Sequence, residues 1–463
     1  MHLIRRLVAW PILLVPLAAA AAPLAGEAAA AHVLNRLAYG PRPGDIERVA
    51  AMGVQRYVDE QLDPAALPLP AALEERLRQL STQQEGVGAT FARWRDARRA
   101  GGEAQRPVNA QLGGEAAEAR LLRAVGSPRQ LEEVMVDFWF NHFSVFAGKG
   151  DVRALATSFE RDAIRPHAFG RFRDLLGATA HHPAMLHYLD NRVSKAGGVN
   201  ENYARELMEL HTLGVDGGYT QRDVTELARM LTGWTFRPDR LAQQGETFHF
   251  DAKRHDTGAK TWLGRPFPPR ARAEGVREGE IALDILAMHP STARHVSGKL
   301  AQYFVRDVPP PALVERMART WMLSDGDVRA VLRTLFASAE FMDDGVAGAK
   351  FKTPYQYVVS AARAGGLAPD AKQLAGALSR LGMPLYGCPT PDGYDDTQEA
   401  WLNPDALGVR IGLAATLGRE ADARTVGQAL GPVLTARTRE LSAAAPARLR
   451  AALLLGSPDF MQR

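Results

Sequence analysis

The segment 131–146 constrains the fold more than any other part of the chain. Its sequence, LEEVMVDFWFNHFSVF, is apolar around almost the whole circumference of a helix. A helix at a protein surface carries one apolar stripe, whereas a helix that is apolar all round has to be covered on every side. The sequence therefore predicts a central helix here, with the remaining elements packed around it.

His142 lies in the most apolar sector of this predicted helix, and Asn141 follows Asp137 by four residues on one edge. An imidazole in such a place is usually a core side chain that hydrogen-bonds to a backbone carbonyl or a carboxylate. It could also belong to a catalytic site in which a glutamate is the general base. We take His142 as a candidate catalytic residue and Asn141 as a candidate binding residue, with the structural interpretation as the alternative.

Helical periodicity dominates the rest of the chain, and no alternation of strands and helices calls for a parallel sheet. With 463 residues, of which 46% are hydrophobic, the chain can bury a large core. We expect a mostly α, multi-helix globular domain over 29–463. Its one small β-hairpin pairs 247–250 with 260–263. A polar stretch near 86–112, rich in Gln, Arg and Gly, is expected to be a mobile excursion.

Two short segments resemble each other. LFASAEFM at 335–342 and LLGSPDFM at 454–461 each close an apolar helix with an acidic residue before Phe-Met. A single pair of matches is weak evidence for duplication. A shared way of docking a helix end onto the core explains it equally well.

The N-terminus is typical of a secretory signal. Arg5 and Arg6 precede the apolar run Leu7 to Leu17, and an alanine-rich stretch follows. This run is shorter than the roughly 20 residues that span a bilayer. We expect residues 1–22 to form a signal peptide, cleaved between positions 19 and 31, and the mature protein to be periplasmic or secreted.

The charge balance makes nucleic acid an unexpected partner. The chain has 56 Lys and Arg against 52 Asp and Glu, and without the two signal arginines the balance is 54 against 52. No basic stripe with interleaved aromatic residues occurs in the sequence. Cys388 is the single cysteine, so an internal disulfide is excluded.

The segment 200–234, NENYARELMELHTLGVDGGYTQRDVTELARMLTGW, predicts two capped helices joined by a glycine turn. The first should run from an N-cap at Asn200 to Thr212 and stop at Gly214, and the second should begin with a Thr220–Asp223 capping box. At about 100° per residue, Glu206 and His211 fall inside the apolar arc of the first helix. An unpaired charge buried there would be costly, so both need partners on the facing surface.

Carboxylates of this segment are the main candidates for chemistry. Glu206 and Glu209 lie about 60° apart on the helix, so both could reach one ion or one substrate group. Arg205 is spaced to pair with Glu201 and Glu209. The alternative is a structural ion pair between Glu206 and an arginine of another helix, for which Arg229 is the candidate.

A second cluster surrounds the predicted hairpin, where His249, Asp251, His255 and Asp256 occur within eight positions. Imidazole and carboxylate together suit zinc, manganese or iron. The spacing matches no established zinc signature, so solvated hairpin residues are the alternative. Much later in the chain, the PTPDGYDD run at 389–396 is expected to be a solvated, turn-rich loop. The alternative is calcium binding by Asp392, Asp395 and Asp396, although their spacing is not that of an EF-hand.

Several blocks together resemble a bacterial family of exported proteins catalogued as domain of unknown function number eighteen hundred. Besides 200–234, the similar blocks are HVLNRLAYGPRPGDIERVAAMGVQRYVDEQLDP at 32–64, FWFNHFSVF at 138–146, RHDTGAKTWLG at 254–264, KFKTPYQYVVSAAR at 350–363, PLYGCPTPDGYDDTQEAWLNP at 384–404 and the terminal SPDFMQR. The resemblance implies no reaction. It implies a co-exported partner that resembles alkaline phosphatases and sulfatases, and it favours a functional role for His255, Asp256 and Lys260.

Two hypotheses follow. The first is an exported binding or assembly module that acts with the phosphatase- or sulfatase-like partner. The second is a metal-dependent hydrolase of the cell envelope that uses a divalent transition metal to activate water. The candidate residues, all present in the sequence, are Glu206, Glu209 and His142 for catalysis; Asn141, Arg205, His211 and Lys260 for binding; and His255 and Asp256 for the metal. Whether they converge on one place decides between the two hypotheses.

Overall fold

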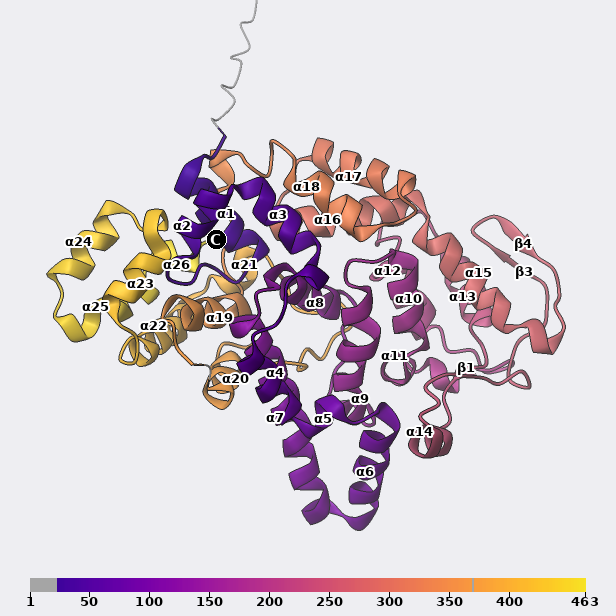
Figure 1. Ribbon diagram of the computed structural model, residues 1–463. Coiled ribbons are helices and arrows are strands. Elements are labelled where there is room, and N and C mark those ends of the chain that lie inside the picture. Colours follow the sequence, from indigo (N-terminus) through magenta and orange to yellow (C-terminus); the bar gives the residue numbers. More distant parts are fainter. Residues whose placement is uncertain (1–22, 369) are drawn as a thin grey trace, which may run out of the picture.

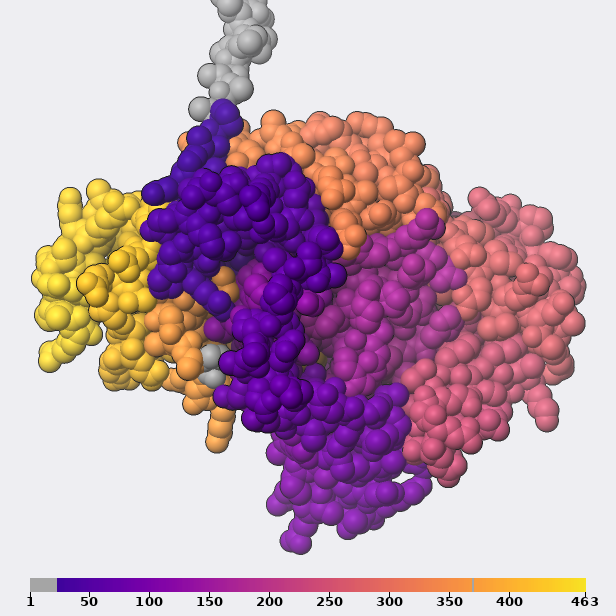
Figure 2. Space-filling view, viewed as in Figure 1, coloured from indigo at the N-terminus to yellow at the C-terminus, as the bar shows by residue number. Residues whose placement is uncertain are grey.

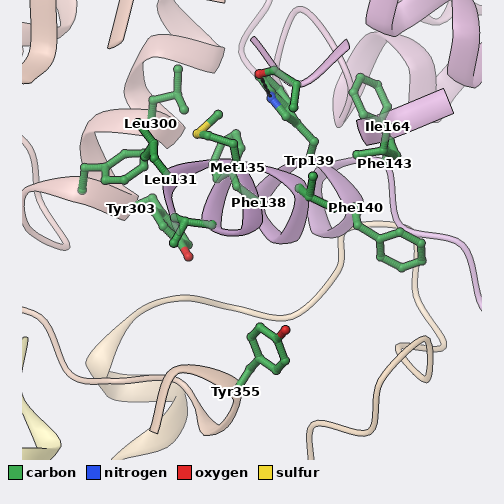
Figure 3. Close-up of a cluster of buried hydrophobic side chains, with 14 of the residues drawn as sticks. Leu131, Met135, Phe138, Trp139, Phe140, Phe143, Ile164, Leu300, Tyr303 and Tyr355 are labelled. Carbon is green, nitrogen blue, oxygen red and sulfur yellow. Dashed lines mark hydrogen bonds between the residues drawn. The ribbon is translucent and has the colours of Figure 1, made fainter. Parts of the chain in front are cut away.

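Helix α8 (Gln130–His142) lies at the centre of the molecule, as the sequence predicts. The structure, a computed structural model, describes residues 23–368 and 370–463. Eleven of the thirteen residues of α8 are buried. Figure 3 shows Leu131, Met135 and Trp139 of this helix among side chains from other segments, including Ile164, Leu300 and Tyr355.

The described chain is mostly α-helical, which confirms the predicted fold class (Figure 1). The helices before α8 are α1 (Gly26–Leu37), α2 (Asp45–Met52), α3 (Val54–Leu62), α4 (Ala71–Arg78), α5 (Ser81–Gln84), α6 (Val87–Ala100) and α7 (Gly102–Gly126). Those that follow are α9 (Val152–Ser158), α10 (Phe172–His181), α11 (Pro183–Tyr188), α12 (Asn202–Glu209), α13 (Gln221–Met230), α14 (Pro238–Gln244), α15 (Val276–Ala287), α16 (Pro290–Phe304), α17 (Pro311–Leu323) and α18 (Val328–Phe336).

The last part of the chain adds a lateral lobe of short helices, coloured yellow in Figure 1. The remaining helices are α19 (Pro354–Ala364), α20 (Ala371–Arg380), α21 (Gln398–Trp401), α22 (Pro404–Leu417), α23 (Ala423–Leu430), α24 (Ala436–Ala444), α25 (Ala447–Leu455) and α26 (Pro458–Met461). None of the described helices combines the length and the apolar character that a membrane span requires. The predicted signal peptide at 1–22 lies outside the described residues.

The β-structure differs from the prediction. Strand β1 (Trp234–Thr235) pairs with β2 (His249–Phe250), and β3 (Lys260–Trp262) pairs with β4 (Arg265–Phe267), both antiparallel. The expected pairing of 247–250 with 260–263 is therefore wrong. The reason is local: Leu263 and Gly264 both have positive φ, at 47° and 72°, which is the geometry of a tight two-residue hairpin turn. The chain after β3 folds back at once and takes the place expected for β2.

The polar stretch near 86–112 is helical and not irregular. It contains α6 and the first part of α7, which project together from the body of the molecule (Figure 1). Helix α6 forms because one side of it is buried: Phe91 and Trp94 are 0% and 2% exposed, and Phe91 packs edge-on against Phe236. The mobility of this excursion stays a prediction.

The two resembling segments end their helices in the same way. Ser338 donates to the carbonyl of Leu335 and accepts from the backbone N–H of Phe341. In the same way, Ser457 donates to the carbonyl of Leu454 and accepts from the backbone N–H of Phe460. Phe341 and Phe460 are both fully buried. The shared sequence thus encodes a serine-closed turn that places a phenylalanine in the core.

A buried ion network links α8 to its neighbours. Arg120 of α7 pairs with Asp137 at 2.5 Å and with Glu160 at 3.3 Å, and Arg165 pairs with Glu160 at 3.3 Å and with Glu133 at 2.9 Å. Burial alone would raise the pKa of Glu160, but Arg120 and Arg165 hold it below its usual value. The guanidinium of Arg120 also lies between three aromatic rings, those of Phe140, Tyr355 and Tyr386, at 5.1 to 5.4 Å.

Replacing Arg120 tests this network. Arg120→Met should lower the free energy of unfolding by about 3–5 kcal/mol, because it leaves the buried Asp137 carboxylate without its partner. Urea unfolding followed by tryptophan fluorescence measures the change. The control is Arg76→Met, which removes an ion pair with Glu118 from an arginine that is 54% exposed and should cost under about 1 kcal/mol. Equal losses in the two variants would contradict a central role for Arg120.

Candidate functional site

The segment singled out by the sequence folds as two helices with the predicted glycine turn. Helix α12 buries Tyr203, Ala204, Leu207 and Met208, and α13 begins with the Thr220–Asp223 capping box. Helix α12 nevertheless ends at Glu209, three residues earlier than expected, because Thr212 donates to the carbonyl of Leu207. The N–H of Gly214 donates to the carbonyl of Met208, which closes the helix end.

Two imidazoles cap this end of α12. His142 Nε2 lies 3.1 Å from the carbonyl of His211, and His295 Nε2 of α16 lies 3.3 Å from the carbonyl of Leu210. Each Nε2 carries the proton because it faces a carbonyl, and the Nδ1 of His142 is left without a partner. A Cβ at Gly214, which has φ of +83°, would come within 2.8 Å of His295. Glycine therefore allows the turn to pass beside this imidazole.

All three histidines are neutral at pH 7. Burial lowers the pKa of His211 to about 3 and that of His295 to about 4, and the positive charge of Lys299 adds to both shifts. Burial, followed by Lys299, lowers the pKa of His142 in the same direction. His142 is thus placed as a core histidine bonded to a backbone carbonyl. His211 lies beside it, with ring centroids 6.1 Å apart.

Asn141 holds the loop 389–396. Its Oδ1 accepts from the N–H of Tyr394 and its Nδ2 donates to the carbonyl of Tyr394, both at 2.8 Å. The hydroxyl of Tyr188 donates to the carbonyl of Pro389 at the other end of the same loop. Both hydrogen-bonding atoms of the Asn141 amide are therefore occupied within the protein.

Glu206 and Glu209 are partly exposed and Asp392 of this loop is exposed, and none of the three carboxylates forms a direct ion pair within the described part of the chain. Partial burial raises the pKa of Glu206, and the negative charges of Glu209 and Asp392 raise it further. The pKa of Tyr219 is raised by burial and then by Glu209 and Glu206. Because these charges act on one another, we treat the four side chains as one group and call it the carboxylate face: Glu206, Glu209, Tyr219 and Asp392.

The cations expected to neutralise these carboxylates are used elsewhere. Arg229 makes a two-point contact with Asp256 at 2.9 and 3.1 Å, so the suggested pair between Glu206 and Arg229 is wrong. Arg205 pairs with Glu201 at 3.3 Å as predicted, and it donates to Gln221 of α13 instead of contacting Glu209. Both arginines connect secondary-structure elements, and the carboxylate face keeps its charge.

His255 and Lys260 lie in a separate, fully buried cluster around Glu278 of α15. Lys260 Nζ is 2.8 Å from Glu278 Oε2, and His255 Nε2 is 3.5 Å from the same oxygen. Lys260 also donates to the carbonyls of Asp256 and Gly258. These contacts join the loop before β3 to α15. The two candidate metal ligands therefore already contact other residues: His255 lies beside Glu278, and Asp256 pairs with Arg229.

The candidate residues are therefore divided among several places. His142 and His211 lie at the end of α12, Glu206 and Glu209 belong to the carboxylate face, and His255, Asp256 and Lys260 lie at the Glu278 cluster. Asn141 holds the loop 389–396, and Arg205 pairs with Glu201. Within the described ranges, no group of three or more His, Cys, Asp or Glu side chains is arranged to hold a metal ion. The convergence that the hydrolase hypothesis needs is not found there. Only Glu206 and Glu209 among the candidates are both accessible and unpaired.

Sequence reasoning missed three residues of these clusters. Glu278 shares a helix stripe with the buried Ala282 and Leu286, and this spacing could have revealed it. His295 and Lys299 are four apart on α16, but nothing in that spacing indicates that they face α12. Burial lowers the pKa of Lys299 even though Asp396, Asp392 and Asp395 lie near enough to raise it.

Comparison with protein families gives one match. The model described as "Protein of unknown function (DUF1800)" matches residues 32–462, which is nearly the whole chain. The chain belongs to the DUF1800 family. The resemblance found in the sequence is thereby confirmed. No curated protein and no solved structure matches the chain. For this DUF1800 protein, the geometry of the site is therefore the basis for a functional proposal.

The unpaired state of Glu206 gives a test that depends on pH. A carboxyl whose pKa is raised by folding contributes stability below its unfolded pKa and loses it as pH rises through the folded pKa. Glu206→Gln removes the penalty on the charged form, so at pH 7 the variant should melt about 1–2 °C higher than the wild type. The difference in melting temperature should shrink as the pH is lowered from 7. Thermal unfolding followed by circular dichroism measures this difference.

The control is Glu201→Gln at the N-cap of the same helix, because Glu201 accepts from Arg205, Gln221 and Thr225. This variant should melt lower than the wild type at pH 7. Early melting of Glu206→Gln as well would show that Glu206 has a stabilising partner, against the geometry described above.

Replacing Asn141 tests how the loop 389–396 is held. Asn141→Ala removes both bonds to Tyr394 and should cost about 2 kcal/mol of stability. Backbone amides of 389–396 should exchange faster with deuterium, because the loop loses its anchor to α8. Asn202→Ala, which removes one long bond of 3.4 Å to Leu189, is the control and should leave exchange in this loop unchanged. Unchanged exchange in Asn141→Ala would contradict the anchoring role.

Proposed function

We propose that this protein is an exported binding or assembly module whose carboxylate face binds a cationic segment of a partner protein. The single observation that supports it is the state of Glu206, Glu209 and Asp392. Other charged candidates, such as Asp256 and Lys260, form direct ion pairs within the protein, whereas these three carboxylates form none among the described residues. A lysine or arginine from a partner would lower the cost of holding Glu206 charged.

The surroundings of these carboxylates suit a protein partner. Val215, in the turn between α12 and α13, is 70% exposed, and Tyr219 lies half-buried beside Glu209. An exposed apolar residue, a tyrosine and charged groups together are typical of protein interfaces. The turn is also rigidly supported, because Gly214 packs on His295 and Asp223 accepts from the N–H of Leu263. Such support reduces the ordering cost of binding.

The partner that family resemblance suggests is a co-exported protein similar to alkaline phosphatases and sulfatases. Export rests on the signal-like sequence at 1–22, with Arg5 and Arg6 before the apolar run. Both proteins would then meet in the periplasm or outside the cell. The proposal assigns binding to the carboxylate face and requires no metal there.

The test is a binding measurement between the purified mature protein and the purified phosphatase- or sulfatase-like neighbour. Glu206→Gln with Glu209→Gln should weaken binding at least about tenfold, since two charge contacts are lost, and added salt should weaken the wild-type complex. Isothermal titration calorimetry provides the affinities. The matched control is Glu47→Gln with Glu74→Gln, which makes the same charge change at two exposed residues far from α12 in sequence.

Absence of any complex between the two purified proteins would refute the proposed partner. A complex that the Glu206 and Glu209 substitutions leave unchanged would refute the proposed face. A melting curve of the double variant checks that it is folded, because the two substitutions should not destabilise the free protein.

A further inference from the structure

The first residues of the described chain are held in the fold by a later segment. Pro23 forms an antiparallel bridge with Asp343, and the N–H of Leu24 donates to the carbonyl of Met342 at 2.9 Å. Figure 2 shows this beginning of the described chain, in indigo, on the outside of the molecule beside orange residues from much later in the sequence. The fold therefore includes residues at least as far back as Pro23.

The next residues lead directly into the core. Helix α1 begins at Gly26, and the three alanines at 29–31 are at most 4% exposed. His32 Nε2 donates to the carbonyl of Phe341 at 2.8 Å, next to the carbonyl that accepts from Leu24. Loss of this stretch would therefore remove backbone bonds and buried apolar contacts from the folded protein.

The sequence offers two groups of bonds to a signal peptidase. This protease requires small residues at the first and third positions before the bond that it cleaves. Within 19–31 the pattern occurs before the bonds that follow Ala20, Ala21 and Ala22, and again before those that follow Ala28, Ala30 and Ala31. The alanine-rich sequence by itself does not distinguish the upstream group from the downstream group.

The contacts of the described residues favour the upstream group. Cleavage after Ala28 would remove the pairing with 342–343 together with the start of α1, and cleavage after Ala30 or Ala31 would also remove alanines of the core. Cleavage in the upstream group leaves all of these contacts in the mature protein. The bond after Ala22 is the least suitable of the upstream three, because the proline nitrogen that follows carries no hydrogen and the proline ring restricts the preceding residue.

We propose that a signal peptidase cleaves the exported chain upstream of Pro23, after Ala20 or after Ala21. In this hydrolysis the carbonyl carbon of that alanine takes the hydroxyl of a water molecule, and the nitrogen of the next alanine takes the proton and becomes the new terminal amine. The mature protein then begins with one or two alanines directly before Pro23, and the whole of α1 is retained. Processing shares with the proposed function only the premise of export, and it does not involve the carboxylate face.

The experiment is expression of the full chain in a Gram-negative bacterium, followed by N-terminal sequencing and intact-mass measurement of the purified protein. The expected N-terminus is Ala21 or Ala22. Any other N-terminus, Met1 included, would overturn the proposal. The location of the protein separates the two premises: Met1 on protein that stays in the cytoplasm refutes export, whereas Met1 on periplasmic protein refutes cleavage alone. Binding at the carboxylate face is measured between purified proteins and is not affected by either result.

Matched variants test the two groups of bonds separately. Ala20→Gln with Ala21→Gln places a larger polar residue at a required small position of every upstream bond, so the uncleaved precursor should accumulate. Ala28→Gln does the same for the bonds after Ala28 and Ala30, at an exposed position, and this control should be cleaved like the wild type. Normal cleavage of the first variant, or accumulation of precursor in the control, would overturn the proposal.

A further measurement tests the physical reason for upstream cleavage. A mature chain made to begin at Ala29 should melt at least about 2 °C lower than the natural mature protein, because it lacks the bond from Leu24 to Met342 and the start of α1. Thermal unfolding followed by circular dichroism gives both melting temperatures. Equal melting temperatures would show that residues 23–28 contribute nothing to the fold, and would overturn the choice of the upstream group.

Discussion

The structure depends on the burial of Arg120. This guanidinium lies beneath three aromatic rings and holds Asp137 of the central helix and Glu160 of the neighbouring segment. Burying these charges is tolerable only because each arginine and each carboxylate of the network has a partner of opposite charge. Glu160 belongs to a π-helical turn, Phe159–Ile164, which widens the helix and lets the same carboxylate reach Arg165 as well. The network thereby fixes α7, α8 and the segment after α9 in one relative position.

Much of the fold could be predicted from the sequence, because those parts depend on local rules. The apolar circumference of 131–146 predicts a central helix, and the Thr220–Asp223 spacing predicts a capping box that the structure contains. The predicted pairing of 247–250 with 260–263 was wrong because the chain turns back directly after Trp262, so that β3 pairs with β4. Leu263 adopts positive φ there, which is uncommon for a branched residue and has no clear signature in the sequence.

The candidate site was predictable only in part. Periodicity placed Glu206 and His211 where they needed partners, but His211 stays neutral because burial and then the positive charge of Lys299 lower its pKa. Helical periodicity could not show which residues, more than 110 positions apart in the sequence, lie next to each other in the fold. Arg229 was a sensible partner for Glu206 by type, yet Asp256 takes it, since the loop before β3 lies closer in the fold. The accessibility of Glu206 and Glu209 follows from tertiary packing, which no spacing rule encodes.

The buried imidazoles have a consequence for the environments in which this fold can exist. In several histidines burial lowers the pKa well below the ordinary 6.5, namely His32, His142, His182, His211 and His295. The unfolded chain takes up protons on these side chains at about pH 6.5, while the folded chain does not. Each such histidine therefore costs about 1.4 kcal/mol of stability for every pH unit below 6.5, until its own folded pKa is reached. The packing that keeps these rings neutral thus makes the folded protein less stable as the pH falls below about 6.5.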